Sequence, residues 1–172
     1  MLLLENGFYM AYRLAYANRN ELKSTSKFWR AIMSKVAVVF WSGTGNTEAM
    51  AEAVADGAKA AGADVSVFAS HEFGVGNVSE FDAIAFGCPA MGAEVLEETE
   101  FEPMFAEVET SLSGKKVALF GSYGWGDGQW MRDWEERTRM RGANLIADGL
   151  MANNAPDANV LDECKSLGRA LA

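Results

Sequence analysis

Short apolar runs alternate with longer segments of helical periodicity over most of the chain. The apolar runs, rich in alanine and β-branched residues, predict buried strands at 35–41, 64–69, 82–87, 116–121 and about 143–150. Apolar residues spaced three and four apart predict helices at about 46–61, 101–112, 129–141 and 157–170. The segment 71–80 has a weak pattern that allows a short helix, and the last strand is expected to continue without an inserted segment.

This order of elements predicts an α/β fold in which helices cover both faces of a parallel sheet. Right-handed crossovers place the helices, and a ligand is expected beyond the carboxyl ends of the strands. Residues 35–172 are therefore expected to form one domain. Residues 1–34 are interpreted as an extension that is non-native or flexible, with a weakly amphipathic helix possible near residues 8–16 and a natural start possible at Met33.

The loop after the first strand has the composition of a phosphate site. Ser42-Gly43-Thr44-Gly45-Asn46-Thr47 joins the strand to a helix-forming segment. Glycines allow close approach of the backbone, and the helix start offers unpaired N–H donors. The loop lacks the lysine of a nucleotide-hydrolysing P-loop, and Glu48 replaces the third glycine of a dinucleotide fingerprint. Neutral donors favour a monophosphate ester, although an ordinary glycine-rich turn is the alternative.

Two further motifs follow the third and fourth strands. They are Gly87-Cys88-Pro89-Ala90-Met91-Gly92, with Glu94 and Leu96-Glu97-Glu98 behind it, and the segment 114–128, which ends Gly121-Ser122-Tyr123-Gly124-Trp125-Gly126-Asp127-Gly128. Together with Trp41–Thr47, and in this order, they resemble the short-chain flavodoxins from about Ser34 to the C-terminus. The resemblance implies a flavodoxin-like three-layer sandwich with a five-stranded parallel sheet in the order 2-1-3-4-5. It also implies flavin mononucleotide (FMN) as the cofactor, bound without a covalent link.

The resemblance further implies a role for each loop. Met91 would lie on the inner face of the isoalloxazine ring and Trp125 on its outer face, with Tyr123 at the ring edge, while Ser122 would reach the phosphate or ribityl chain. The Gly92 carbonyl would accept a hydrogen bond from the reduced flavin N5, and Glu94 would meet the N3 side. The full set of cofactor-binding residues implied is Ser42, Gly43, Thr44, Gly45, Asn46, Thr47, Pro89, Ala90, Met91, Gly92, Ala93, Glu94, Ser122, Tyr123, Gly124 and Trp125.

Ala93 gives a specific expectation about the flavin loop. A type II turn over residues 91–94 needs a positive φ at its third position, which alanine tolerates poorly. We therefore expect the semiquinone to be less favoured than with glycine there, by about 1 kcal/mol. For one electron this corresponds to roughly 40 mV.

Charge is distributed unevenly along the chain. Residues 1–34 hold five basic and two acidic residues, whereas 35–172 hold ten basic and twenty-two acidic ones. An acidic domain disfavours nucleic acid and anionic membranes and favours basic docking surfaces on protein partners. The acidic residues at 94, 97, 98, 100 and 102 have two interpretations: a negative ring that destabilises the anionic hydroquinone, or a solvated helix start.

The remaining candidate chemistry is sparse. Cys88 and Cys164 have no metal-ligand spacing and are expected to be reduced packing residues of a cytoplasmic protein, and the single histidine, His71, is expected to be a surface side chain. We therefore predict a monomeric, low-potential one-electron carrier that cycles through semiquinone and hydroquinone, exchanges electrons with reductase or ferredoxin-type donors and soluble acceptors, and has no catalytic residues or metal. The alternatives are an FMN-dependent NAD(P)H quinone or nitro reductase on the same fold and, more weakly, a phosphorylation receiver.

Overall fold

A parallel sheet forms the centre of the computed structural model, which describes residues 33–172. The expectations for the N-terminal extension fall almost entirely outside this range. The strands are β1 (Lys35–Phe40), β2 (Asp64–Ala69), β3 (Ala83–Gly87), β4 (Lys116–Tyr123), β5 (Asn144–Leu145) and β6 (Leu150–Asn153). All pair in parallel, in the order β2-β1-β3-β4-β5, and β6 extends along the same edge of β4 as β5. The predicted fold class and strand order are confirmed.

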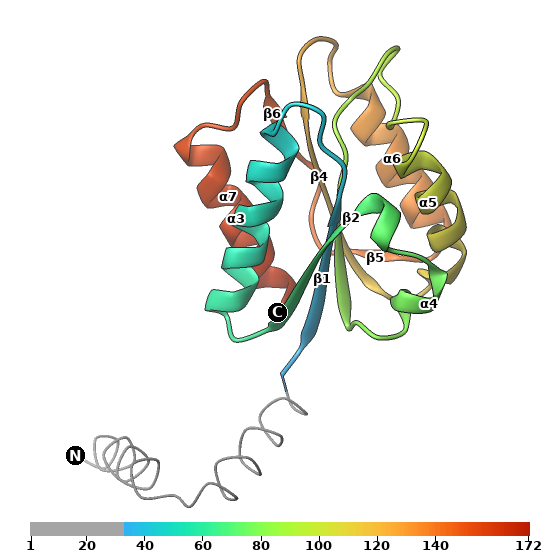
Figure 1. Ribbon diagram of the computed structural model, residues 1–172, viewed down its shortest axis with the longest axis vertical. Coiled ribbons are helices and arrows are strands. Elements are labelled where there is room, and N and C mark those ends of the chain that lie inside the picture. Colours follow the sequence, from blue (N-terminus) through green and yellow to red (C-terminus); the bar gives the residue numbers. More distant parts are fainter. Residues whose placement is uncertain (1–32) are drawn as a thin grey trace, which may run out of the picture. The chain divides into compact units, whose positions relative to one another are not determined.

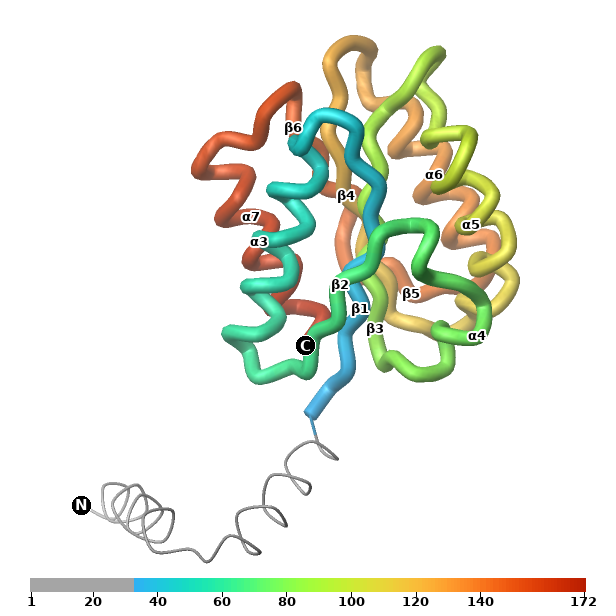
Figure 2. Tube along the Cα trace, in the orientation of Figure 1, coloured from blue at the N-terminus to red at the C-terminus, as the bar shows by residue number. Residues whose placement is uncertain are grey.

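Helices cover both faces of this sheet, as Figures 1 and 2 show. One face carries α3 (Asn46–Ala60) and α7 (Ala158–Leu171); the other carries α4 (Val75–Val78), α5 (Phe101–Val108) and α6 (Gln129–Met140). Short 3-10 turns, η1 (Ser70–Glu72) and η2 (Glu109–Ser111), follow β2 and α5. In the segment expected to be a helix at 101–112, the α-helix therefore ends at Val108 and η2 follows it. The weakly patterned segment 71–80 includes most of η1 and all of α4.

Two apolar cores result, one on each face. Alternate residues of the buried strands point to opposite sides: Val36 and Val38 pack toward α3 and α7, whereas Ala37 and Val39 face the aromatic-rich core beneath α4–α6. That second core contains edge-to-face contacts, including Phe86 against Phe105 with ring centroids 5.2 Å apart. Burial of both strand faces explains why these runs are continuously apolar.

The prediction of an uninterrupted last strand was wrong. Residues 146–149 separate β5 from β6, although both pieces pair with β4. Within this break, the Gly149 N–H donates to the Glu135 carboxylate on α6. The Gly149 N–H thus has the Glu135 carboxylate of α6 as its acceptor in place of a carbonyl group of a neighbouring strand. Among residues 33–172, no helix is both long enough and apolar enough to cross a bilayer.

Candidate functional site

The three motif loops meet at the carboxyl edge of the sheet and surround one cleft. β1, β3 and β4 end side by side, so the loop that follows each begins at the same edge. The cleft has a volume of about 310 Å³, within the range of small-molecule sites. Its lining consists of Trp41, Gly43, Thr44, Asn46, Pro89, Ala90, Met91, Tyr123, Gly124 and Asn154, none of which is charged.

The first loop leads directly into α3. Gly45 is the N-cap with φ of 87°, a conformation that glycine adopts without strain, and its N–H donates to the Ser42 Oγ at 3.1 Å. The first N–H groups of α3 have no carbonyl partner within the helix and carry its partial positive charge. With the half-buried Asn46 and the exposed Thr44 on the cleft wall, this end suits an anion without any lysine or arginine.

The Trp41 ring packs against this loop. A Cβ at Gly43 would lie 2.9 Å from the Trp41 ring, so the absence of a side chain lets the loop pack closely on the indole. Trp41 also packs against the core beneath α4–α6. Thr47 is buried and is not part of the cleft lining, and its Oγ1 lies 3.3 Å from the buried Ser122 Oγ at the end of β4. This hydroxyl pair joins the first and third loops.

The second loop continues the hydrogen bonding of β3 before it turns. The Cys88 N–H donates to the Phe120 carbonyl at 3.0 Å, and the Ala90 N–H to the Ser122 carbonyl at 2.9 Å. This close approach requires a glycine, because a Cβ at Gly121 would lie 2.0 Å from the Cys88 carbonyl oxygen. Pro89 and Ala90 are thereby held along the cleft wall.

The turn beyond them differs from the expected one. Met91 and Val95 form an antiparallel bridge with two backbone hydrogen bonds of 2.8 and 3.0 Å. The positive φ values fall at Gly92 (47°) and Glu94 (55°), so Ala93 does not adopt the strained conformation that we expected of it. The expected positive φ at Ala93 was therefore wrong, while the effect of Ala93 on the semiquinone stays a prediction.

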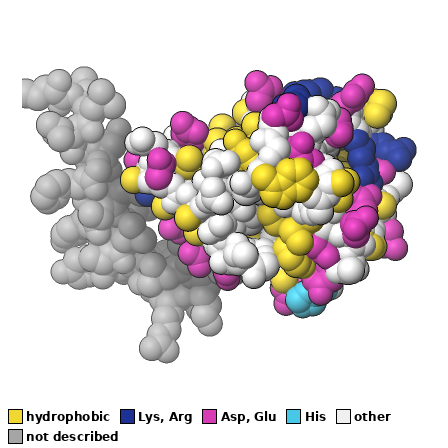
Figure 3. Space-filling model, turned by 90° about the horizontal axis from the view of Figure 1, so that it is seen from above, with side chains coloured by type: hydrophobic (Ala, Val, Ile, Leu, Met, Phe, Trp, Pro, Cys, Tyr) yellow, Lys and Arg dark blue, Asp and Glu magenta, His cyan; other side chains and the backbone are white. Residues whose placement is uncertain are grey.

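Glu94 reaches from this turn to the start of α6. Its Oε1 accepts hydrogen bonds from the N–H groups of Gly128 at 3.0 Å and Gln129 at 3.1 Å. In the third loop itself, Tyr123 is half-buried against Trp130, with ring centroids 5.4 Å apart, while Trp125 is 62% exposed. Figure 3 shows the loop end, where apolar side chains gather near the centre with acidic ones around them.

The structure thus brings half of the expected cofactor residues into one cleft. Ser42, Gly45, Thr47, Gly92, Ala93, Glu94, Ser122 and Trp125 belong to the same loops but do not line it. Two lining residues, Trp41 and Asn154, were absent from the predicted set. Asn154 follows β6 with φ of 61°, and its N–H donates to the Tyr123 carbonyl at 2.7 Å. Because the last strand was expected to end at 150, this residue was not placed at the sheet edge.

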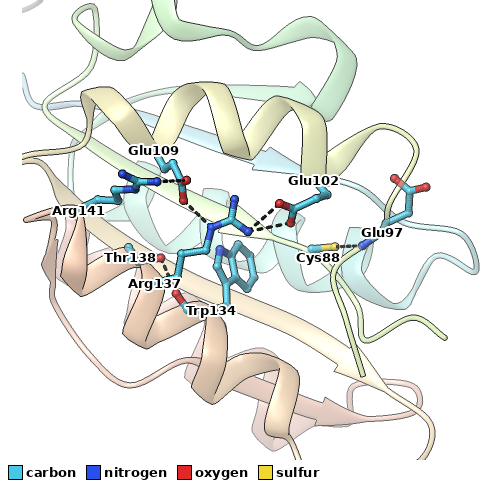
Figure 4. A network of polar contacts seen from close by, with 8 residues as sticks. All are labelled: Cys88, Glu97, Glu102, Glu109, Trp134, Arg137, Thr138 and Arg141. Atoms are coloured by element: carbon cyan, nitrogen blue, oxygen red, sulfur yellow. Dashed lines mark hydrogen bonds and ion pairs between the residues drawn. The ribbon is translucent and has the colours of Figure 1, made fainter. Parts of the chain in front are cut away.

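Most of the acidic run has intramolecular partners. Glu97 is buried and accepts hydrogen bonds at the start of α5, and Glu102 pairs with Arg137 of α6 at 2.7 Å. Arg137 also binds the buried Glu109 (Figure 4). Its guanidinium lies 5.2 Å from the centre of the Phe105 ring. Burial opposes the charge of Arg137, but its two carboxylate partners outweigh this and raise its pKa. These contacts tie α5 to α6.

Both cysteines are buried thiols. Burial raises the pKa of Cys88 well above its usual range, and the Glu97 N–H donates to its Sγ at 3.3 Å. Burial, with a smaller contribution from Glu163, raises the pKa of Cys164 to about 12. A thiol that stays protonated is a poor nucleophile, in agreement with a packing role.

Comparison with known proteins identifies the family. Residues 38–168 match the family model of the flavodoxins. The chain belongs to the flavodoxin family. It is 49% identical over 135 residues to a flavodoxin of Clostridium beijerinckii, covering 78% of this chain and 97% of that one. It is also 49% identical over 140 residues to a flavodoxin of Megasphaera elsdenii, covering 80% and 98% of the two chains.

Solved flavodoxin structures agree with this. The solution structure of two-electron reduced Megasphaera elsdenii flavodoxin superposes with a TM-score of 0.74 at 49% identity, covering 79% of this chain and 97% of that one. A flavodoxin from the domain Archaea gives a TM-score of 0.72 at 32% identity, over 80% and 96%. The predicted resemblance to short-chain flavodoxins is confirmed. FMN is the cofactor of this family, whose members transfer electrons.

The cleft fits such a group. One end presents a helix N-terminus with neutral donors, as a phosphate ester requires, and the other presents Met91 and Tyr123, which suit a flat aromatic ring.

Proposed function

We propose that the chain carries single electrons at low potential between redox proteins, using FMN held in this cleft. The observation that carries the proposal is the lining: three loops from separate strands enclose one uncharged cleft with an anion-binding helix start at one end. Bound FMN supplies the ability to accept and release electrons one at a time. The protein's own residues hold the cofactor and set the electrostatics around it.

Each loop has a part in this proposal. Thr44, Asn46 and the first N–H groups of α3 hold the phosphate, while Met91 lies on the inner face of the ring and Tyr123 at its edge. Trp125, which is largely exposed at the loop tip, covers the outer face of the ring. Because the lining holds no lysine or arginine, nothing in it offsets the added negative charge of a reduced ring, which favours a low potential.

The acidic surface suggests the partners. Residues 35–172 have twelve more acidic than basic residues, so we propose redox partners with basic docking surfaces. We also propose a monomer that works in the cytoplasm and has no substrate turnover of its own. Residues 35–172 form the domain that does this work.

Thr44→Val tests the phosphate end. A hydroxyl that donates to a charged acceptor contributes about 1.5–3 kcal/mol, so FMN affinity should fall at least about tenfold. Riboflavin, which lacks the phosphate, should bind the variant and the parent within about twofold. Thr110→Val, at an exposed site in η2, is the matched control and should change neither affinity. Equal losses for both flavins would contradict the assignment.

An anaerobic reductive titration of the FMN-loaded chain tests the carrier role. We expect a one-electron-reduced species in the absorption spectrum before full reduction, and a second midpoint more negative than that of free FMN. Rapid oxidation of NADPH with a quinone, in the absence of an added reductase, would overturn the proposal in favour of a reductase.

A further inference from the structure

Strand β2 forms an open edge of the parallel sheet. Its six residues, Asp64–Ala69, pair one-to-one with β1 without a bulge, and no other strand within residues 33–172 pairs with it. The opposite edge of the sheet is irregular, because residues 146–149 interrupt it between β5 and β6. A regular, unbroken edge is a template on which another extended chain can pair.

Alternate residues of β2 direct their backbone groups away from β1. The Asp64 N–H donates to the Ser34 carbonyl at 2.8 Å, on the β1 side. Successive residues of a strand point their backbone groups to opposite sides, so those of Val65 and Val67 face the free edge. Ala69, the next in this series, agrees, because its N–H donates to a carboxylate of η1 at 2.9 Å and not to β1. The edge thus offers the N–H and carbonyl groups of two residues, about 6.6 Å apart along the strand.

The middle of this edge is apolar and carries no blocking residue. The Val67 side chain is 44% exposed, whereas Val65, on the same face of the sheet, packs against the core beneath α3. Residues 65–69 include no charged residue and no proline. Lysine, proline and bulges, which prevent pairing at many edge strands, are thus absent from β2.

Both ends of the same edge are acidic. Asp64, the first residue of β2, is exposed, although Lys35 of β1 lies opposite it in the register. At the other end, the exposed Glu72 holds the Ala69 N–H through its Oε2. Two copies of β2 paired with each other would bring acidic ends together in either direction, which is unfavourable. The edge therefore suits a segment with basic ends and disfavours a second copy of this chain.

We propose that β2 is a docking edge for an extended segment of a partner protein. The segment pairs with the backbone groups of Val65 and Val67, lays an apolar side chain on Val67, and brings a lysine or arginine to each acidic end. Addition of a strand to a sheet edge is a common mode of peptide recognition, in which main-chain hydrogen bonds supply affinity and alternate side chains supply specificity. No residue of β2 lines the cleft, so this docking is separate from cofactor binding.

A capped synthetic peptide, Lys-Val-Thr-Val-Thr-Val-Lys, is the probe. With the full-length FMN-loaded chain it should bind with a dissociation constant of about 0.1 mM, so about 1 mM peptide fills about nine-tenths of the sites. Amide hydrogen exchange at Val65 and Val67 should then slow about tenfold, because the peptide backbone pairs with these N–H groups. The amide of Met151, in β6 at the opposite edge, should not change. Unchanged exchange at both valines would overturn the proposal.

Two altered peptides test the chemistry without changing the protein. Replacing both lysines of the peptide by glutamate should weaken binding at least about tenfold, because two attractive contacts become repulsive. N-methylation of alternate peptide amides should abolish binding in the register that faces β2, and methylation in the other register should weaken it less. Equal binding of the lysine and glutamate peptides, or equal binding of the two methylated ones, would count against strand addition at this edge.

Protein variants locate the peptide. Val67→Lys places a charge on the edge and should weaken binding at least about tenfold. Val75→Lys, at a valine with 43% exposure on α4 over the other face of the sheet, is the matched control and should bind as the parent does. Glu72→Gln keeps an acceptor for the Ala69 N–H and should weaken binding about threefold. Parental affinity in Val67→Lys would place the peptide elsewhere and refute the assignment.

Exchange in the chain without peptide distinguishes other occupants of the edge. We expect fast exchange at Val65 and Val67 that is independent of protein concentration. Protection that grows with concentration would assign the edge to a second copy. Protection that is already complete in dilute solution would show that the chain itself covers the edge. Either result would exclude an open docking edge for a partner.

Discussion

Glu97 offers a test of how the second loop is held. Glu97 is 5% exposed, and its carboxylate accepts hydrogen bonds from the Thr99 hydroxyl and from the N–H groups of Thr99, Glu100 and Phe101. Burial opposes ionisation, but these hydrogen bonds outweigh it and lower the pKa of Glu97 to about 2. We expect Glu97→Gln to destabilise the fold in a strongly pH-dependent way.

The magnitude follows from the two pKa values. A fall from 4.5 to about 2 corresponds to about 3 kcal/mol of stabilisation of the folded state. Because the folded pKa lies below the unfolded one, this stabilisation is complete above pH 4.5 and disappears as the pH falls toward 2. At pH 3, about 1 kcal/mol of it remains.

Urea unfolding of the parent and Glu97→Gln at pH 7, 5, 4 and 3 measures this. The free energies of unfolding should differ by about 3 kcal/mol at pH 7 and 5, and the difference should shrink by more than half at pH 3. Glu98→Gln, at an exposed neighbouring site, is the control and should follow the parent. A difference that stays constant from pH 7 to pH 3 would refute the reasoning, because it would show that Glu97 acts through packing and not through its charge.

Two further substitutions test the helix contacts. Gly168→Ala should lower the free energy of unfolding by about 1–3 kcal/mol, because its Cβ would lie 2.0 Å from the Val54 carbonyl oxygen on α3. Gly76→Ala, which has open space around it, should lower this free energy by less than about 0.5 kcal/mol. Equal losses of stability in the two variants would contradict the prediction. Arg137→Met should lower the free energy of unfolding by about 3 kcal/mol, since it leaves the buried Glu109 with one partner. Lys59→Met, which breaks the exposed pair with Asp56, should lower it by less than about 1 kcal/mol in the same assay.

Local patterns were sufficient for most of the fold. The apolar residues 36–39 are buried on both faces of the sheet, and such a run can be recognised without any knowledge of its partners. The position of the site followed from the same patterns, because parallel strands bring their carboxyl ends to one edge. Thr44 and Met91, from two different loops, accordingly line the same cleft.

The errors arose where a distant residue decides the local conformation. The break after β5 is accompanied by a hydrogen bond from Gly149 to Glu135, fourteen residues earlier on another element. In the turn closed by Met91 and Val95, the positive φ of Glu94 accompanies a contact with α6, thirty-four residues away. Turn rules based on Ala93 and its neighbours contain no information about either partner, so they assigned the strain to the wrong residue.

The acidic run shows how such contacts change an electrostatic expectation. From the sequence alone, one interpretation of the five glutamates is a ring of negative charge around the cofactor. In the structure, Glu97 is stabilised by backbone donors at α5, and the charge of Glu102 is offset by Arg137 at 2.7 Å. A paired carboxylate exerts a much weaker field at a distance than a free one. Glu102 must therefore contribute far less to any electrostatic effect of the run on the reduced cofactor than a glutamate without a cationic partner.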